Sequence, residues 1–574
     1  MIKCHKRFKL VRMDNKKKLI LFTIVLTCLL SCSEDLTEYY TRLDQREIAN
    51  KSQEQANSKQ EQQNVNQQNK NQQLRLEGEE LRRRLTELEQ SLVTVPDPKM
   101  RSVYFFKEEN PGLSGNVKCD ILGDSIIDCW LPGGIRDEKL LVPRFDFDGT
   151  LVLFDGIEAK SGVTKVDCMK PVKVLVLTTE KQQEYTMYVH SYTGLPILYI
   201  TTSGRQAITS KDYYLNAQFR LVEDVKTRSA GDVISTTVQI KGRGNSSWQQ
   251  PKKGYRLKFN EKVSLLGEHK DKSWVLITNY SDKSMVRNRA ACFMSSISML
   301  DYTPKSHFVE LVLNGTYNGT YELCEKIKIS NHRVAVGDDG FLLEIDIRAP
   351  EESSACFFRT NYLENCVNIK EPEVHYNDDN FNYIQGFFFQ AEAALFGSNF
   401  KDLSIGWQKY LDINSFVDWY LINEISKNLD ALFWSSCYMN LKRGGKLKMG
   451  PVWDFDVAFG NINQDNQTCF LPSGFYIKNV RWYSRLFQDP AFVSKVKERF
   501  NFFYNHKDEI FAYINSDAQY LKYAVSENEN RWGTLYTYTW SNYDIWGSYQ
   551  NEVQSLKEWL NTRMDWLKTQ FDKM

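Results

Sequence analysis

The order of short segments between about residue 195 and residue 346 constrains the fold of this chain more than any other feature. Residues 195–202 and 232–248 have strand-like patterns, and the second run ends in a polar turn that contains Gly242 and Gly244. A short alternating strand follows at 254–259, and residues 281–298 carry a helical pattern. Residues 307–329 are predicted as two strands joined by Asn314-Gly315, which is a strong hairpin signal. This succession predicts an α+β fold.

The turn that begins at Gly242 has the composition of a phosphate-binding loop. Glycines in a polar turn let backbone N–H groups approach phosphate oxygens, although such turns also end ordinary hairpins. Lys258 falls fourteen residues after Gly244, on the next strand. In protein kinases a strand lysine at about this offset contacts the ATP phosphates. A solvated strand lysine is the alternative, and three nearby cations compete for the role: Lys252, Lys253 and Arg256.

Three aspartates follow a long predicted helix at residues 411–428. Asp430 stands just beyond this helix, and Asp454 and Asp456 flank Phe455 after an intervening hairpin. Kinases use one such carboxylate to orient the acceptor hydroxyl and take its proton, and another to hold Mg²⁺ against the phosphates. The alternative is structural: Asp430 caps a turn, while Asp454 and Asp456 bind Ca²⁺ or pair with arginine.

Seven segments, in order, resemble the CotH kinase family, which is named after spore coat protein H. The resemblance covers about 380 residues, from 195 to the end of the chain. The segments are RGNSSW (243–248), KKGYRLKF (252–259), LLGEHKDKSWVLITNYSDKSMVRN (265–288), FVELVLNGTYNGTYELCEKI (308–327), GFLLEID (340–346), WYLINEISKNLDA (419–431) and GGKLKMGPVWDFDVAFGN (444–461).

The resemblance implies a bilobal, atypical protein-kinase-like domain, with a small lobe at about 195–346 and a large lobe at about 347–574. It also implies that the domain binds ATP with Mg²⁺ and phosphorylates serine in a partner protein. By motif, Asp430 resembles the catalytic aspartate, and Asp454 and Asp456 resemble metal ligands. The implied nucleotide contacts are Arg243, Gly244, Asn245, Ser246, Lys258 and Glu325. The implied supporting residues are Asn279, Asp282, Arg287 and Asn428.

Three features depart from ordinary kinases. Residues 281–298 contain no glutamate to pair with the strand lysine. Ser435 stands five residues after Asp430, where kinases place a metal-binding asparagine, and no glycine follows Asp454-Phe455. We therefore expect a site whose geometry differs from that of ordinary kinases.

Residues 1–31 are predicted to be an export signal. Residues 15–18 (NKKK) are basic, and residues 19–30 form an apolar run too short to span a membrane. Ser31-Cys32 then resembles a lipobox, which implies cleavage before Cys32 and a lipid anchor on it; an ordinary secretory signal is the alternative. Met13 is a better start than Met1. The acidic residues at 34–35 resemble the surface-export signal of Bacteroidetes lipoproteins, so we expect a cell-envelope protein at the outer membrane, periplasmic or surface-exposed.

Residues 32–42 are predicted to be a lipidated tether and residues 43–94 a Gln-rich helical stalk. Residues 43–73 are almost devoid of apolar side chains and cannot bury a core. A leucine stripe follows, about three heptads long, which is marginal for a coiled coil. We favour a spacer helix, with oligomerisation through the stalk as the alternative. The stripe consists of Leu74, Leu81, Leu85, Leu88 and Leu92.

Residues 97–191 are predicted to form a small all-β sandwich of Ig-like type. Six short apolar runs recur there at roughly ten-residue spacing. The segment has no catalytic constellation, so we expect a spacer or adhesion module. The twelve cysteines include no CxxC pair, which argues against a zinc site. Cys119–Cys129 and Cys356–Cys366 are the candidate local disulfides.

The charge distribution excludes nucleic acid as a partner. Residues 1–31 carry eight Lys/Arg and one Asp, and so contribute +7 to a formal net charge of +1. The remainder is therefore at −6, without the basic footprint that nucleic-acid binding needs.

These features predict ATP- and Mg²⁺-dependent phosphoryl transfer to Ser or Thr of an envelope or surface protein. Because free ATP is scarce outside the cytoplasm, the alternative is a non-catalytic, pseudokinase-like binding or adhesion module on a lipid-anchored stalk. Retention of all three aspartates favours the enzyme. Six aromatic residues near the C-terminus offer glycan contacts, although core packing is their more ordinary role. They are Trp532, Tyr536, Tyr538, Trp540, Tyr543 and Trp546.

Overall fold

The computed structural model describes residues 58–91, 97–132, 140–223, 233–463, 468–540 and 542–574, in two units that divide after residue 95. The predicted export signal, Cys32 and the tether lie outside these ranges. In the first unit the described part of the segment predicted as a stalk is a helix, α3 (Ser58–Ser91), on which Leu74, Leu76 and Leu81 are exposed. Within the described ranges, no helix combines the length and apolarity needed to cross a membrane.

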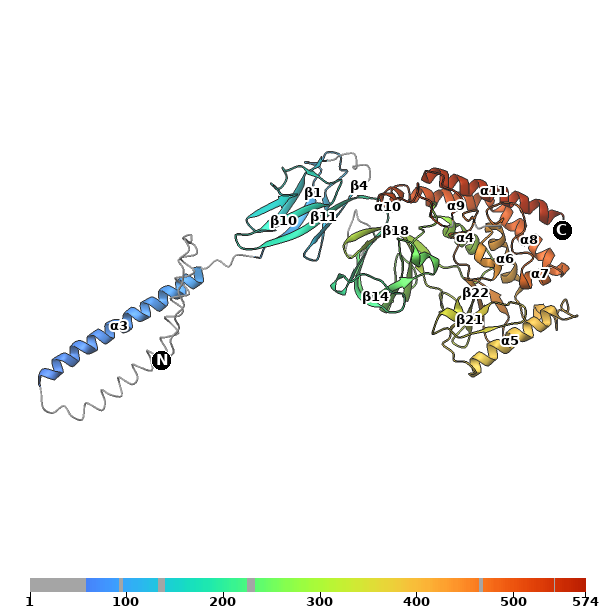
Figure 1. The fold of residues 1–574 in the computed structure, drawn as a ribbon, viewed down its shortest axis with the longest axis horizontal. Helices are drawn as coiled ribbons and strands as arrows, with labels where there is room; N and C mark the ends of the chain where they lie inside the picture. The colour runs from blue at the N-terminus through green and yellow to red at the C-terminus, as the bar shows by residue number, and fades with distance from the viewer. Residues whose placement is uncertain (1–57, 92–96, 133–139, 224–232, 464–467, 541) are drawn as a thin grey trace. The chain divides into compact units, whose positions relative to one another are not determined.

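The second unit begins with two β-sheets around one apolar core (Figure 1). One sheet has the order β2-β1-β6 and the other β3-β4-β11-β10-β7-β8, and β5 pairs with β9. Each of the six predicted apolar runs overlaps a strand, while the Ig-like type stays a prediction. The strands are β1 (Lys99–Phe105), β2 (Val117–Lys118), β3 (Asp120–Leu122), β4 (Ile126–Pro132), β5 (Leu140–Leu141), β6 (Pro143–Asp148), β7 (Leu151–Phe154), β8 (Ile157–Glu158), β9 (Val166–Asp167), β10 (Val172–Leu177) and β11 (Gln182–Tyr192).

One of the two candidate disulfides forms. Cys119–Cys129 joins the start of β3 to β4, as predicted. The prediction of Cys356–Cys366 is wrong, because both thiols are free and buried. Pairing of β20 (Phe357–Arg359) with β21 (Cys366–Glu371) explains the difference. Cys366 lies opposite Arg359, and the Cys356 carbonyl accepts a hydrogen bond from Ile369, so the two cysteines are out of register.

Residues 197–325 contain a closed barrel of seven strands in the order β12-β13-β14-β15-β16-β18-β17. Parallel pairing of β12 with β17 closes it. Alternate residues such as Leu257 and Trp274 fill the interior, so their neighbours along the strands face outward. The strands are β12 (Ile197–Thr202), β13 (Leu215–Val222), β14 (Val233–Arg243), β15 (Gly254–Val263), β16 (Asp271–Ile277), β17 (Ser306–Leu313) and β18 (Thr316–Glu325).

Helix α4 (Arg287–Ser296) separates β16 from β17 and is shorter than the helix predicted at 281–298. The reason is the buried Asp282 side chain, which accepts hydrogen bonds from the backbone N–H groups of Ser284 and Arg287. This local bonding holds residues 282–286 in a turn that precedes the helix.

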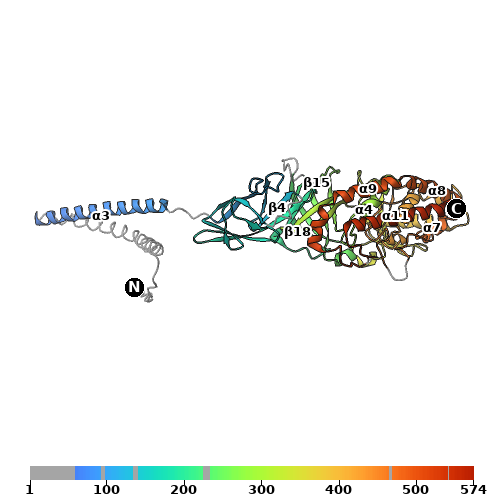
Figure 2. The same cartoon turned by 90° about the horizontal axis from the view of Figure 1, so that it is seen from above.

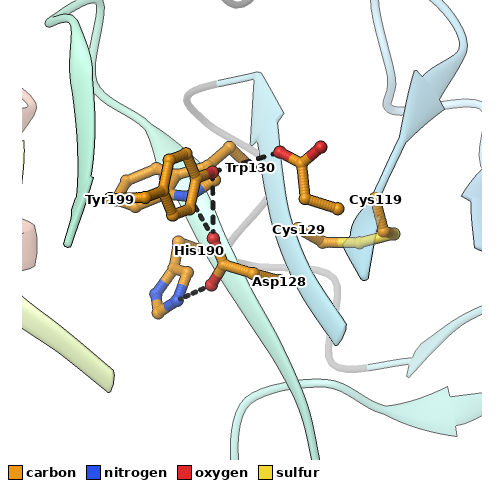
Figure 3. Close-up of a disulfide and its surroundings, with 7 residues drawn as sticks. Cys119, Asp128, Cys129, Trp130, His190 and Tyr199 are labelled. Atoms are coloured by element: carbon orange, nitrogen blue, oxygen red, sulfur yellow. Dashed lines mark hydrogen bonds and ion pairs between the residues drawn. A yellow bond between two sulfur atoms is a disulfide. The ribbon is translucent and has the colours of Figure 1, made fainter. Parts of the chain in front are cut away.

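The β3–β4 hairpin joins the two-sheet region to the barrel (Figure 3). Asp128 is fully buried and accepts hydrogen bonds from Trp130 Nε1 at 2.8 Å and from the Tyr199 hydroxyl of β12 at 3.2 Å. His190 Nε2 lies 3.1 Å from the same carboxylate. Trp130 also packs edge-on against Tyr317 of β18, with centroids 5.5 Å apart. The junction is therefore a packed, hydrogen-bonded interface.

The remainder of the chain builds on a sheet of order β20-β21-β19-β22-β23. Strand β19 (Phe341–Ile345) falls within the range predicted for the small lobe, yet it pairs with β21 and β22 (Cys437–Leu441). Strand β23 (Leu447–Met449) completes the sheet. The predicted helix at 411–428 is α6, and α11 runs beside α8 and α9 (Figure 2). The helices are α5 (Asp379–Phe396), α6 (Ile413–Ser426), α7 (Arg481–Leu486), α8 (Pro490–Asn505), α9 (Lys507–Tyr520), α10 (Ala524–Trp532) and α11 (Tyr549–Asp572).

Candidate active site

The structure brings the three predicted aspartates together. Asp430 lies in a short 3-10 turn, Leu429–Leu432, that follows α6, and Asp454 and Asp456 lie in the irregular segment after β23. Burial, followed by the charges of Asp454 and Asp456, raises the pKa of Asp430 well above its ordinary value. The three carboxyl groups therefore share one poorly solvated, electronegative site.

Asn428 positions two of these aspartates. Its Oδ1 accepts a hydrogen bond from the Asp430 backbone N–H at 3.3 Å, and its Nδ2 donates to the Asp454 carbonyl at 3.2 Å. Asp454 itself has a positive φ of 68°, a conformation that few non-glycine residues adopt. Asn428 therefore links the turn that carries Asp430 to the segment that carries Asp454.

Asp456 is tied to the connection between β16 and α4. Ser281 Oγ donates to its carboxylate at 2.7 Å, and Asn461 Nδ2 donates to its carbonyl at 2.7 Å. Burial, and then the charge of Asp454, raise the pKa of Asp456 to about 7. Both effects indicate that no cation among the described residues compensates the charge of this carboxylate.

The donor set at Asp454 and Asp456 fits Mg²⁺. No part of the chain that the structure describes gathers three or more side chains into a protein-only metal cage. Mg²⁺ does not need such a cage, because it is usually held by one or two carboxylates together with water and substrate phosphates. Asp454 and Asp456 supply two such carboxylates. Their negative charges repel each other, and a bound divalent cation would neutralise them.

Asn288 is a site residue that sequence reasoning missed. Its Oδ1 accepts from the Phe455 backbone N–H at 2.7 Å, and its Nδ2 donates to Asn279 Oδ1 at 3.2 Å. Asn279 in turn donates to Glu322 of β18 at 3.2 Å. Helix α4 therefore contacts the segment that carries Asp454 and Asp456 through the amide side chain of Asn288, and not through a glutamate. In the sequence, only the position of Asn288 at the end of the NYSDKSMVRN segment indicated this role.

Asp282 and Arg287 support the fold of this region. Their side chains form a buried ion pair, and Asp282 also accepts from the Arg287 backbone N–H at 2.9 Å. The pair fixes the turn before α4, which carries Ser281 and Asn288. Among the described residues, no hydrogen bond or ion pair joins this pair to the three aspartates, so we assign it a bracing role.

Cations line the outward face of β14 and β15. The Arg243 guanidinium lies 5.6 Å from the Trp453 ring, next to Asp454 in the chain. Lys241 lies opposite Arg256 in the strand register, and the Nε of Arg256 is buried without a partner among the described residues. Burial, and then the Arg256 charge, lower the pKa of Lys326 to about 8. Crowded, half-buried cations of this kind suit a phosphate-bearing ligand.

Lys258 and Glu325 are predicted nucleotide contacts, but in the described ranges neither makes a contact with the three aspartates. Lys258 is exposed, and its ammonium group lies 5.9 Å from the Tyr214 ring. Glu325 is buried and accepts from the Tyr302 hydroxyl at 2.9 Å, while Arg333 Nε lies 3.3 Å from its other oxygen. Glu325 therefore braces the end of β18.

The predicted turn that contains Gly244 needs a glycine at this position. Gly244 has a φ of 104°, and a Cβ there would lie 2.2 Å from Ser247 Oγ. Any larger residue would distort the turn. Asn245 and Ser246 are exposed at its tip, where their backbone is accessible to a ligand.

Comparison with known proteins supports a single assignment. A search of curated proteins finds no match. A family model described as CotH kinase protein matches residues 240–567. The matched range includes the glycine turn, the cationic face of β15 and all three aspartates. The match to this family implies the use of a nucleotide and a metal in general terms. Because it spans more than half of the 574 residues, the chain belongs to the CotH kinase family.

Proposed function

We propose that this protein transfers a phosphoryl group from ATP, with Mg²⁺, to Ser or Thr of an envelope or surface protein. The observation that carries the proposal is the shared site of Asp430, Asp454 and Asp456, in which the pKa values of Asp430 and Asp456 are raised. Family membership supports it, because kinase-like chemistry needs these groups.

Each residue has a defined task in this reaction. Asp454 and Asp456 would hold Mg²⁺, which when bound neutralises phosphate charge. Asp430 accepts a hydrogen bond from the acceptor hydroxyl and orients it. It takes the hydroxyl proton as the new oxygen–phosphorus bond forms and the bond between the γ-phosphorus and the bridging oxygen breaks, so that ADP leaves. Burial raises the pKa of Asp430, which makes its ionised carboxylate a stronger base than that of an exposed aspartate. Arg243 and Arg256 orient the phosphates, supported by Lys326.

Calorimetric titration of the purified protein with ATP, with and without Mg²⁺, tests the proposal. We expect saturable, Mg²⁺-dependent binding that Asp454→Asn weakens at least roughly tenfold. Asp430→Asn should retain binding and lose transfer to a serine-peptide library. The exposed Asp508→Asn on α9 is the control and should match wild type. A well-folded protein that binds no nucleotide would contradict the proposal and favour the non-catalytic binding module.

We further propose that the chain is anchored in the cell envelope through a lipid on Cys32 and requires no nucleic-acid partner. Helix α3 then acts as a spacer between membrane and domain, with self-association through its exposed leucines as the alternative. Cys32→Ser should move the protein from the membrane fraction to the soluble fraction. Retention of the variant in membranes would contradict the lipid anchor.

A further inference from the structure

Five aromatic side chains between α10 and α11 are exposed. Their exposed fractions run from 43% for Tyr543 and Trp546 to 75% for Tyr536. Among the described residues only Tyr543 stacks on another ring, that of Phe470, with centroids 4.4 Å apart. The expectation of core packing is therefore wrong for these five, which we call the aromatic surface: Tyr536, Tyr538, Trp540, Tyr543 and Trp546. Several exposed aromatic rings close together in the chain suit an interaction site.

The backbone beneath the aromatic surface is held firmly. The buried Asn542 donates from Nδ2 to the Ser281 carbonyl at 2.6 Å and to Asn461 Oδ1 at 3.0 Å. At the C-terminal end, the Trp546 N–H donates to Glu552 at 3.0 Å. At the N-terminal end, the Leu535 N–H donates to Glu529. The described part of the loop is thus fixed at Leu535, Asn542 and Trp546, which lowers the entropy cost of binding.

The same hydrogen bonds place the loop beside the candidate active site. Ser281, which accepts from Asn542 through its carbonyl, donates through its hydroxyl to Asp456 at 2.7 Å. Asn461, the other partner of Asn542, donates to the Asp456 carbonyl. Asn542 is therefore linked to Asp456, a proposed metal ligand, in two ways, through Ser281 and through Asn461.

We propose that the aromatic surface is the docking site for the polypeptide acceptor of the kinase. The inference rests on the proposed function and names the partner of the same site. Residues 533–548 carry one charged side chain, Asp544, and two aliphatic ones, Leu535 and Ile545, among Tyr, Trp, Ser, Thr, Asn and Gly. Loops that bind proteins share this composition, because rigid rings give a large contact area and small polar residues give adaptable hydrogen bonds. With no cation among them, they do not suit an anionic lipid surface.

Peptide binding measured separately from nucleotide binding tests this inference. The probe is an array of serine-containing peptides, exposed to the labelled full chain. The variant is Tyr536→Ser/Tyr538→Ser/Trp540→Ser, and the control is Tyr520→Ser/Tyr523→Ser, which removes rings of similar exposure (47% and 51%) near the end of α9. We expect the variant to bind the array at least roughly tenfold more weakly than wild type. The control should bind like wild type, and all three proteins should keep the same affinity for ATP with Mg²⁺.

Other results would overturn the inference. Equal peptide binding by variant and wild type, or no peptide binding by wild type, shows that the rings do not dock a polypeptide. Ring-dependent retention on peptidoglycan without ring-dependent peptide binding assigns the surface to a glycan instead. Failure of wild type to bind ATP defeats the proposed function, and the acceptor role with it. Normal ATP binding with unaltered peptide binding defeats the docking surface alone.

Discussion

Lys252 shows how the fold separates structural cations from those available to a ligand. Its Nζ donates to the Thr278 carbonyl at 2.8 Å and to Asn528 Oδ1 of α10 at 2.9 Å. Burial lowers its pKa to about 7, against an opposing effect of Glu310. Of the cations near the glycine turn, Lys252 therefore links the barrel to α10, while the half-buried Arg256 has an Nε that lacks a hydrogen-bond partner among the described residues.

The depressed pKa of Lys252 predicts a specific dependence of stability on pH. Between about pH 7 and its ordinary value of 10.5, the unfolded chain binds a proton at this lysine that the folded chain does not. This group's contribution to the free energy of unfolding therefore rises with pH across that window and is constant below it. Urea unfolding of Lys252→Met should lack this part of the rise, whereas the exposed Lys262→Met should keep it. Identical slopes for both variants would contradict the assignment.

Asn288 gives a prediction for the site itself. Asn288→Ala removes the acceptor of the Phe455 N–H and should cost about 1–3 kcal/mol at a buried position. Because Phe455 lies between the two proposed metal ligands, Mg²⁺-dependent ATP affinity should fall roughly tenfold while weak Mg²⁺-independent binding persists. Calorimetry measures both. The exposed Asn382→Ala on α5 serves as control, and an unchanged Mg²⁺ dependence in Asn288→Ala would remove its positioning role.

At the scale of elements, the β3–β4 hairpin couples the two-sheet region to the barrel. Trp130 lies in one apolar cluster with Tyr199, Val312 and other barrel residues, beside the buried Asp128. On the other strand, Asp120 lies opposite Asp128 in register and accepts from the Tyr199 hydroxyl at 3.2 Å. The Cys119–Cys129 bond holds the two carboxylate-bearing strands together.

This junction predicts cooperative unfolding. Trp130→Ala should cost about 3–5 kcal/mol, because a large buried side chain is removed at the junction. In differential scanning calorimetry we expect one main transition for the two-sheet region and barrel of wild type, and two separated transitions for the variant. Tyr104→Ala, on β1, removes a half-buried ring outside the junction and should leave the transitions joined. Two transitions in wild type would show that the junction does not couple the regions.

The elements that sequence patterns predicted are those fixed by nearby residues. The Asn314-Gly315 hairpin became β17 and β18, and α6 matches the helix predicted at 411–428 within two residues at each end. Barrel closure was not predictable, because Ile197 pairs with Glu310 across more than a hundred residues. The placement of β19 likewise depends on β22, far along the chain.

The residues of the candidate site also fall into two groups, those that local sequence patterns predict and those that only the fold brings together. The three aspartates could be found because each follows a local helix or strand pattern at a recognisable spacing. Asn542 could not, because its role depends on Ser281 and Asn461, which only the fold brings to it. The choice between Lys258 and Arg256 was also beyond sequence reasoning. Both face outward on β15, and they differ only in the neighbours that bury one and not the other.

At the scale of the whole molecule, α3 bears on whether the protein works alone. Exposed pairs such as Glu80–Arg84 stabilise a single helix, and the leucine stripe is short for a coiled coil. We therefore expect a monomer in sedimentation velocity at micromolar concentration, and no change in sedimentation for Leu74→Ser/Leu81→Ser. A wild-type dimer that the double variant dissociates would instead establish self-association through the stalk.

The closure of the barrel by β12 has a mechanical consequence. This strand follows β11 after only residues 193–196, and it is hydrogen-bonded on both edges, to β13 and to β17. Tension along the strand from its N-terminal side must shear both rows of hydrogen bonds at once, rather than peel them apart one by one. Force applied to the chain on the N-terminal side of β12 would therefore enter the barrel at a strand that is hydrogen-bonded on both edges.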